Sequence, residues 1–254
     1  MIVRMLGPTI GEAVALSSYL VNGTTLVDCG GAGVGGDFAR QAAVRNIFLT
    51  HAHLDHVASL PILLDNVYGS GTPPVVHGSA ATLDILQRDL FNDRLWPDFI
   101  ALSQQLAPFL QVRKFQDGVV VGIPGMTVEP VAVDHVIPTS AFILQEPGTA
   151  AAIVTDTAPT HDIWRRLART PNLRAVLLEC SFPDELAGLA VASKHLTPTT
   201  FAAEAAQLPA GVRLLAVHLK PQHHARIARE LAVVCPRAEI VRPEHDYSFG
   251  AGVA

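Results

Sequence analysis

Short apolar stretches recur along the chain, and six of them end at a residue that can bind a metal or move a proton. Most are rich in valine, isoleucine and leucine, which is typical of β-strands. They cover 25–27 before Asp28, 46–50 before His51, 131–133 before Asp134 and His135, 152–155 before Asp156, 175–178 before Glu179, and 213–217 before His218. Because layered α/β proteins place their chemistry on loops at the edge of a rigid sheet, we expect these side chains to share one rim.

Helix-like segments alternate with the strands, and several of them repeat apolar residues at spacings of three and four. These segments cover 80–90, 98–110, 162–168, 199–208 and 223–233. Thr197 followed by Pro198 predicts a helix start, with threonine as the N-cap and proline in the first turn. The alternation predicts an α/β fold.

The composition favours one compact domain over residues 1–254, because 49% of the residues are hydrophobic and no internal repeat or low-complexity tract divides the chain. The three cysteines are scattered, which argues against a disulfide framework. Neither a signal peptide nor an apolar run of about 18 residues is evident, so we expect a soluble, cytoplasmic protein without a membrane partner. The net charge of −5 disfavours binding to many nucleic-acid phosphates.

The densest group of polar side chains is the segment His51-Ala52-His53-Leu54-Asp55-His56, directly after a predicted strand. Imidazole and carboxylate groups are ligands that zinc accepts. In an extended segment, residues i and i+2 face the same side, so His51 and His53 can bind one ion. The turn that follows directs Asp55 and His56 toward a second ion. So many adjacent imidazoles have no packing role, and the segment predicts a metal site.

The motif His-x-His-x-Asp-His resembles the metal-binding motif of the metallo-β-lactamase superfamily, whose members have a four-layer αββα sandwich with two metal ions. The other strand-end residues follow the order found in that superfamily. The resemblance implies that the first ion is held by His51, His53, His135 and Asp156. It implies that the second ion is held by Asp55, His56, Asp156 and His218. Asp28 matches an aspartate that supports the metal loop from behind.

Zinc is the expected metal for this donor set, and manganese and iron are the alternatives that residue identity leaves open. Two divalent ions roughly 3.5 to 4 Å apart can activate a shared water and stabilise an in-line displacement. The resemblance therefore implies a hydrolase.

A proton donor is expected at His195, which resembles the non-ligand histidine that protonates the departing alkoxide in the phosphodiesterase branches of the superfamily. Glu179 can accept a hydrogen bond from its other ring nitrogen and keep the ring protonated. The alternative is that His195 caps the helix expected after it. Asp55, a ligand that also orients the nucleophile, completes the expected catalytic set.

Several segments resemble the class II cyclic-nucleotide phosphodiesterases in particular. They are 17–20, Leu54 within the metal motif, 90–98, 193–198 and 218–221. The resemblance implies hydrolysis of the 3′,5′-cyclic phosphodiester of cAMP, with cGMP as a second candidate, to the 5′-monophosphate. For the purine, Trp96 or Phe91 would stack on the base and Asn92 would contact the nucleotide. The alternative is that this aromatic pair fills the core of a helical insert near 79–116.

The segment 59–64 departs from the class II pattern and resembles the tRNA 3′-processing ribonuclease Z branch instead. Against that branch stand Leu54, where it has glycine, the segment 218–221, the negative net charge and the lack of a long basic arm. A di-iron oxygen reductase would carry glutamate in place of His53, and a non-catalytic relative would have lost ligands. We therefore expect a small cyclic nucleotide as partner, not a nucleic acid. A homodimer stays open, as do the roles of His77, His161, His223, His224 and His245.

Overall fold

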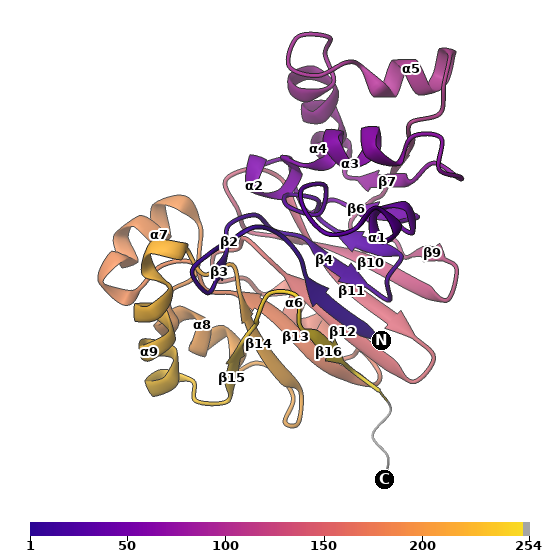
Figure 1. The fold of residues 1–254 in the computed structure, drawn as a ribbon. Helices are drawn as coiled ribbons and strands as arrows, with labels where there is room; N and C mark the ends of the chain where they lie inside the picture. Colours follow the sequence, from indigo (N-terminus) through magenta and orange to yellow (C-terminus); the bar gives the residue numbers. More distant parts are fainter. Residues whose placement is uncertain (251–254) are drawn as a thin grey trace. The chain divides into compact units, whose positions relative to one another are not determined.

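The computed structural model describes residues 1–250 of the chain, which form two compact units (Figure 1). Of the described residues, unit 1 contains Met1, residues 10–14 and residues 117–250. Unit 2 contains residues 2–9 and 15–116. Two short strands, β2 (Thr9–Ile10) and β3 (Ala13–Val14), pair with each other in a separate small sheet.

Unit 2 is built on a mixed sheet with the strand order β1-β4-β5-β6-β7-β8. Its first three strands pair antiparallel and are β1 (Ile2–Met5), β4 (Tyr19–Val21) and β5 (Thr25–Val27). The next three continue in parallel and are β6 (Asn46–Phe48), β7 (Val75–Gly78) and β8 (Gln111–Lys114). Parallel neighbours need long crossover connections, and helices supply them here.

The helices of unit 2 cover its sheet with one continuous apolar core. They are α1 (Phe38–Ala42), α2 (Leu54–Val57), α3 (Leu60–Val67), α4 (Ala80–Ile85), the π-helix η1 (Leu86–Leu90) and α5 (Phe99–Gln105). The predicted helix over 98–110 is shorter than expected, because Pro108 cannot continue it. The predicted helix over 80–90 is present, but its second half winds as a π-helix.

Unit 1 contains a sheet with the strand order β15-β14-β13-β12-β11-β10-β9. An antiparallel meander comprises β9 (Val121–Ile123), β10 (Met126–Val133), β11 (Thr139–Glu146) and β12 (Thr149–Val154). The strands that follow in parallel to β12 are β13 (Leu173–Glu179), β14 (Arg213–Val217) and β15 (Ala238–Ile240). All six predicted strands, two in unit 2 and four in unit 1, are present.

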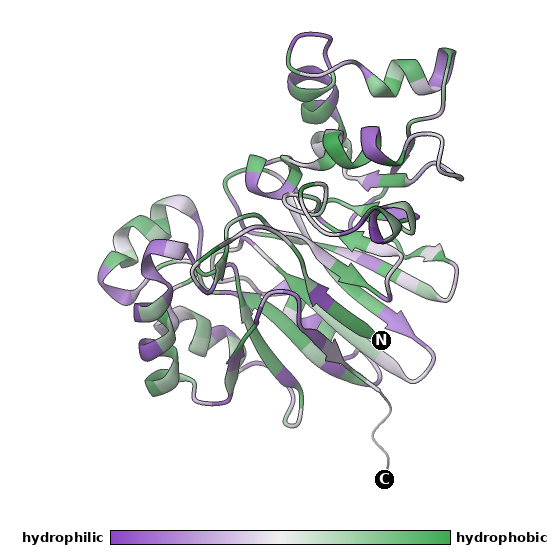
Figure 2. Cartoon of the chain, in the orientation of Figure 1, coloured by the Kyte–Doolittle hydropathy of each residue, from purple (hydrophilic) through white to green (hydrophobic). Residues whose placement is uncertain are grey.

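The helices of unit 1 pack apolar side chains against its sheet in a second core. They are α6 (Asp162–Leu167), η2 (Asp184–Leu186), α7 (Ala187–Ser193), α8 (Pro198–Ala205), η3 (Pro221–His223) and α9 (His224–Val234), and the short strand β16 (Asp246–Ser248) follows them. Thr197 caps α8 in a capping box with Thr200, as the Thr-Pro pair predicts, so His195 is not the cap. In Figure 2, the strands of this sheet are mostly hydrophobic, whereas α9 shows both kinds of residue. Within residues 1–250, we find no helix with the length and apolar character of a membrane span.

His77 on β7 is a structural histidine of unit 2. Its ring stacks on Phe48 of β6 with the ring centroids 4.1 Å apart, and its Nε2 lies 3.1 Å from the Asn46 Oδ1. Burial, together with the nearby charge of Arg113, lowers the pKa of His77 from 6.5 to about 4. The ring is therefore neutral in the folded protein at pH 5, whereas it is protonated in the unfolded chain.

This difference predicts a loss of stability in mild acid. The contribution of His77 is fully present above the unfolded pKa of 6.5 and is lost as the pH falls toward 4. Between pH 7.5 and 5, the wild-type free energy of unfolding should fall by about 1 to 2 kcal/mol more than that of His77→Phe, which keeps the stacking. Urea unfolding at both pH values measures this difference. An equal fall in the two proteins would mean that His77 takes up its proton in the folded state.

Candidate metal centre

In unit 2, two neighbouring strand ends bring Asp28 to the histidine motif. Strands β5 and β6 run parallel, so Asp28 and Thr50 follow them at the same edge of the sheet. Asp28 has a φ of 59°, a left-handed conformation that is uncommon outside glycine. Its buried carboxylate accepts hydrogen bonds from the Thr50 backbone N–H at 2.8 Å and from His56 Nδ1–H at 2.6 Å. Burial raises the pKa of Asp28, although the contacts with His56 and Thr50 act in the opposite direction.

The hydroxyl of Thr50 orders two imidazoles from behind, a role that no pattern in the sequence indicates. It donates to the Asp28 Oδ2 at 2.9 Å and lies 2.9 Å from the Nδ1 of His51. A hydroxyl that donates to a carboxylate has its lone pairs left to accept, so we assign the Nδ1–H tautomer to His51. The same reasoning applies to His56, whose Nδ1 faces Asp28. Both rings therefore keep the lone pair of Nε2 for a metal.

The candidate ligand atoms of unit 2 form two close pairs. The Nε2 of His51 and the Nδ1 of His53 are 2.9 Å apart, and the Nε2 of His56 lies 3.8 Å from the Oδ2 of Asp55. Two nitrogens bound to one zinc at about 2 Å in a tetrahedral site are about 3.3 Å apart. Both pairs are therefore spaced for a shared ion, as the i, i+2 pattern predicts for the first pair.

Gly30 brings the loop after β5 against the histidine motif. A Cβ at this position would lie 1.9 Å from the backbone oxygen of Asp55 and 2.9 Å from that of Ser17. The Gly30 N–H donates to the Ser17 carbonyl at 2.9 Å, and the Ser17 N–H donates to the Asp55 carbonyl at 2.7 Å. Only glycine fits this close approach, which places the backbone of Asp55.

Gly30→Ala should therefore disturb both stability and metal binding. Because the clash is with backbone and not with a flexible side chain, we expect the free energy of unfolding to fall by about 2 kcal/mol or more. We also expect fewer divalent metal ions per chain after dialysis. Gly122→Ala is the matched control, since open space surrounds that glycine on β9. Thermal unfolding and elemental analysis provide the two readouts, and equal values for both variants would contradict the proposed role of Gly30.

In unit 1, four strand ends carry the remaining candidate residues. Strands β10, β12, β13 and β14 run in the same direction, so their carboxyl ends lie at one edge of the sheet. The residues at or just after these ends are His135, Asp156, Glu179 and His218. Asp156 and His218 have φ values of 51° and 59°, so the chain turns in a left-handed conformation at both positions. The predicted shared rim is present for these four residues.

Asp156 offers one oxygen to each of two imidazoles. Its Oδ2 lies 3.8 Å from the Nε2 of His135, and its Oδ1 lies 3.4 Å from the Nε2 of His218. All three side chains are buried. This geometry suits a carboxylate that bridges two metal ions, each with a further nitrogen ligand.

Glu179 is a buried carboxylate that contacts His195 directly and His218 through the hydroxyl of Ser181. It accepts hydrogen bonds from His195 Nδ1–H at 2.8 Å, from the Ser181 hydroxyl at 2.7 Å and from the Thr157 N–H at 3.0 Å. The Ser181 oxygen in turn lies 3.0 Å from the Nδ1 of His218, so the Nε2 of that ring is the nitrogen that a metal could bind. Ser181 was not predicted as a site residue, and its only signal in the sequence is the i, i+2 spacing from Glu179.

His195 is placed to act as an acid beside the candidate ligands of unit 1. Its ring centroid is 5.1 Å from that of His135 and 5.7 Å from that of His218. Burial alone would lower the pKa of His195, but the charge and hydrogen bond of Glu179, with a contribution from Asp156, outweigh burial and raise it. The protonated ring is therefore favoured, as a proton donor requires.

The residues predicted to contact a purine are engaged in packing and turn contacts within unit 2. Phe91 is buried and stacks on Phe99, and Trp96 contacts the same ring edge-on with the centroids 6.3 Å apart. The side-chain oxygen of Asn92 accepts hydrogen bonds from two backbone N–H groups of its own loop. These contacts fit the alternative that the aromatic pair fills the core of the insert. Contact with a nucleotide stays a prediction.

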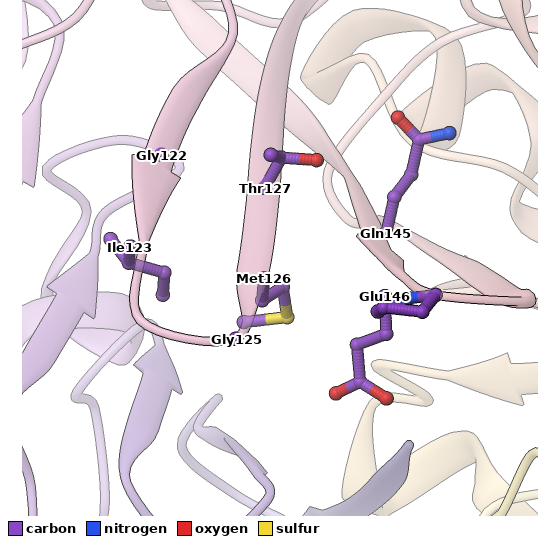
Figure 3. A pocket seen from close by; sticks show the side chains of 8 residues that line it. Gly122, Ile123, Gly125, Met126, Thr127, Gln145 and Glu146 are labelled. Carbon is purple, nitrogen blue, oxygen red and sulfur yellow. The ribbon is translucent and has the colours of Figure 1, made fainter.

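A separate pocket in unit 1 lies away from these residues. It has a volume of about 480 Å³ and is lined by the β9–β10 hairpin and the β11–β12 turn (Figure 3). Met126 lines it at the start of β10, whereas His135 follows the end of that strand. The pocket is thus at the opposite end of the sheet from the candidate ligands.

The donor set fits divalent metal ions. Among the described residues of each single unit, ligand atoms lie within 4.8 Å of each other in His51 with His53, Asp55 with His56, His135 with Asp156, and Asp156 with His218. Four of the five histidines also have their second ring nitrogen against a hydroxyl, a carboxylate or a carbonyl. Such backing is typical of metal-binding histidines, because it fixes the tautomer and the ring orientation.

Comparison with known sequences links the chain to phosphodiesterases. Residues 37–146 match the family model of the class-II cAMP phosphodiesterases. A probable 3′,5′-cyclic-nucleotide phosphodiesterase of Yersinia pestis is 27% identical over 209 residues, which are 71% of this chain and 58% of that protein. A ribonuclease Z of Mycobacterium marinum is 30% identical over 150 residues, which are 53% of either chain. The chain thus spans less than two thirds of the length of these relatives.

Comparison with solved structures identifies the fold. The structure of unliganded yeast PDE1 matches with a TM-score of 0.81 at 17% identity, and the match covers 96% of this chain and 98% of the yeast chain. The metallo-β-lactamase fold protein YhfI of Bacillus subtilis has a TM-score of 0.75 at 20% identity and covers 97% of this chain and 99% of its own. The chain therefore has the metallo-β-lactamase fold, and the fold predicted from the histidine motif is confirmed.

Proposed function

We propose that this chain, whose residues 37–146 match the family model of the class-II cAMP phosphodiesterases, is a metal-dependent 3′,5′-cyclic-nucleotide phosphodiesterase. Its expected substrate is cAMP, with cGMP as a second candidate, and the product is the 5′-monophosphate. The observation that carries the proposal is the group in unit 1, where a carboxylate faces two imidazoles and a third imidazole is paired with buried Glu179. A metal-dependent hydrolase of phosphodiesters uses both elements, a metal ligand set and a proton donor for the leaving oxygen.

The proposed metal ligands are those that the histidine motif predicts. His51, His53, His135 and Asp156 would hold the first ion, and Asp55, His56, Asp156 and His218 the second. Nitrogen donors with a shared carboxylate favour zinc over manganese or iron. When bound, two such ions activate water and neutralise charge on the phosphoryl oxygens.

The chain's own groups then supply orientation and a proton. Glu179 holds the Nδ1–H of His195, so the opposite nitrogen, Nε2, is the position that donates to the departing 3′ oxygen. Ser181 and Thr50 keep the ligand rings in one tautomer. Asp55 contributes a second carboxylate, which would orient the attacking water while it binds metal.

The ribonuclease Z relative supports a second candidate function, cleavage of precursor tRNA. The helical insert does not favour it. Residues 79–116 contain four basic residues (Arg88, Arg94, Arg113 and Lys114) and four acidic ones (Asp84, Asp89, Asp93 and Asp98), so their formal charge is zero. A segment that grips RNA needs an excess of positive charge.

Product analysis separates these functions. Zinc-loaded and manganese-loaded protein is incubated with cAMP, cGMP, a 2′,3′-cyclic nucleotide and a precursor tRNA, and the products are resolved by chromatography and gel electrophoresis. We expect 5′-AMP from cAMP and no activity after chelation. Cleavage of the tRNA trailer without any turnover of cAMP or cGMP would overturn the proposal. Elemental analysis of the same samples should give two zinc ions per chain.

A further inference from the structure

Lys194 occupies an unfavourable backbone conformation at the end of α7. Its φ and ψ are both 56°, which is the left-handed region where glycine and asparagine are preferred. A lysine here raises the conformational free energy of the helix end relative to glycine. A glycine here would remove this strain, but it would also remove every contact that the lysine side chain makes.

The side chain and the backbone of Lys194 both contact the segment that carries His135. The Nζ donates to the Oδ1 of Asp134 at 2.6 Å and to the carbonyl of His135 at 3.3 Å. The carbonyl of Lys194 in turn accepts a hydrogen bond from His135 Nδ1–H at 3.1 Å. Three contacts thus join one residue to two consecutive residues about sixty positions earlier in the chain.

Stability does not explain this arrangement well. The side chains of Lys194 and Asp134 are 39% and 52% exposed, and ion pairs this exposed contribute little to folding. The contacts of Lys194 instead fix the orientation of the His135 ring. The hydrogen bond from Nδ1–H leaves the Nε2 of His135 as the metal-binding atom, and that atom faces Asp156.

The same residue also places the proton donor. His195 follows Lys194 directly, and its backbone N–H donates to the carbonyl of Ala190 at 2.8 Å. The rings of His135 and His195 have their centroids 5.1 Å apart. A shift of the Lys194 backbone would therefore move a candidate ligand and the candidate acid together.

We propose that Lys194, through its ion pair with Asp134, is a positioning residue that fixes the ring of His135 relative to His195. The inference rests on the proposed function, because it assigns His135 to the first metal ion and His195 to the leaving oxygen. The amine of Lys194 orders the His135 backbone, and the carbonyl of Lys194 orders the His135 ring. Together they set the distance between the metal ligand and the acid.

The test uses three single variants and one exchange. Lys194→Met removes the amine and keeps the aliphatic stem, and Lys194→Gly removes the side chain while it relieves the left-handed conformation. Lys194→Arg keeps the charge, and the pair Asp134→Lys with Lys194→Asp reverses the ion pair. Lys114→Met, at an exposed position of β8, is the matched control. The readouts are zinc affinity by competition with a fluorescent chelator, thermal unfolding, and kcat and KM for cAMP.

We expect Lys194→Met and Lys194→Gly to lower kcat about tenfold and to weaken binding of one zinc ion by a similar factor, which is the usual effect of losing a group that orients a ligand. KM should stay within about twofold of the wild-type value, because the residue does not contact the substrate. Lys194→Gly should unfold at or above the wild-type temperature, which excludes a general loss of structure. Lys194→Arg should recover most of the zinc affinity and of kcat. The exchanged pair should recover only part of both, because an aspartate at position 194 restores the ion pair but cannot donate to the His135 carbonyl.

Two results would overturn the inference. Unchanged zinc affinity and kcat in Lys194→Met and Lys194→Gly would show that the ion pair between Lys194 and Asp134 is a surface contact without a positioning role. A raised KM with unchanged kcat and zinc affinity would place the amine on the substrate instead. If the wild-type protein binds zinc but hydrolyses neither cAMP nor cGMP, the proposed function fails, while the zinc affinities of the variants still decide the role of Lys194.

Discussion

Asp156→Asn should abolish phosphodiester hydrolysis and reduce the zinc content below two ions per chain, while the fold is retained. Each oxygen of Asp156 faces the Nε2 of a candidate ligand, His135 on one side and His218 on the other. An asparagine keeps the shape and tolerates the left-handed φ of 51°, but its amide carries two N–H donors where a bridging ligand needs a lone pair and a negative charge. We expect the rate to fall on the order of 10³-fold or more.

Elemental analysis and cAMP turnover measure this effect, and circular dichroism checks the fold. The matched control is Asp162→Asn, an exposed aspartate in the first turn of α6 whose loss should leave both readouts unchanged. A variant at position 156 with two tightly bound zinc ions and nearly wild-type turnover would show that Asp156 does not bridge.

His195→Ala should lower kcat for cAMP by roughly 10² to 10⁴ and leave the zinc content unchanged, since a positioned general acid contributes about this much. The loss should be much smaller for bis(p-nitrophenyl) phosphate, because p-nitrophenolate departs without a proton. Equal losses on both substrates would argue against proton donation. Loss of zinc would instead make His195 a ligand.

Glu179→Gln tests the same proton by its pH dependence. Glu179 raises the pKa of His195, so the protonated acid is present below that raised value and is lost as the pH rises through it. Removing the negative charge lowers the pKa of His195. The alkaline limb of the kcat profile for cAMP should therefore move to lower pH in the variant. An alkaline limb at the wild-type pH would exclude Glu179 as the group that sets the protonation of His195.

The strand ends could be predicted because the physical signal is local. A short apolar run followed by a carboxylate or an imidazole predicts both a buried strand and the edge where it stops, as at Val154 before Asp156 and at Val217 before His218. The shared direction of four strands in unit 1 then brings these residues to one rim. Helix α7 was not predicted, because its sequence has no alternation of apolar and polar positions. Its apolar residues do not mark a buried face, since Val191 is 76% exposed in the structure.

The hydroxyl groups behind the histidines could not be predicted for a different reason. A threonine or serine near a strand end is common, and only the folded backbone decides whether its oxygen reaches an imidazole. Thr50 does so because the left-handed turn at Asp28 returns the carboxylate to it, and Ser181 does so because Glu179 lies two residues earlier on the same side. The contact of Lys194 with Asp134 likewise spans sixty residues and leaves no local pattern.

The hydroxyl groups of Thr50 and Ser181 have a consequence for the removal and rebinding of metal. Thr50 and Ser181 each connect a buried carboxylate to two imidazoles, so the rotamers of these rings are restricted by hydrogen bonds within their own unit. The loss of side-chain entropy then occurs when the chain folds, and metal uptake adds little further ordering. Removing and reloading the metal should therefore leave the structure within each unit nearly unchanged, and backbone amide exchange rates around Thr50 and Ser181 should hardly depend on the ion.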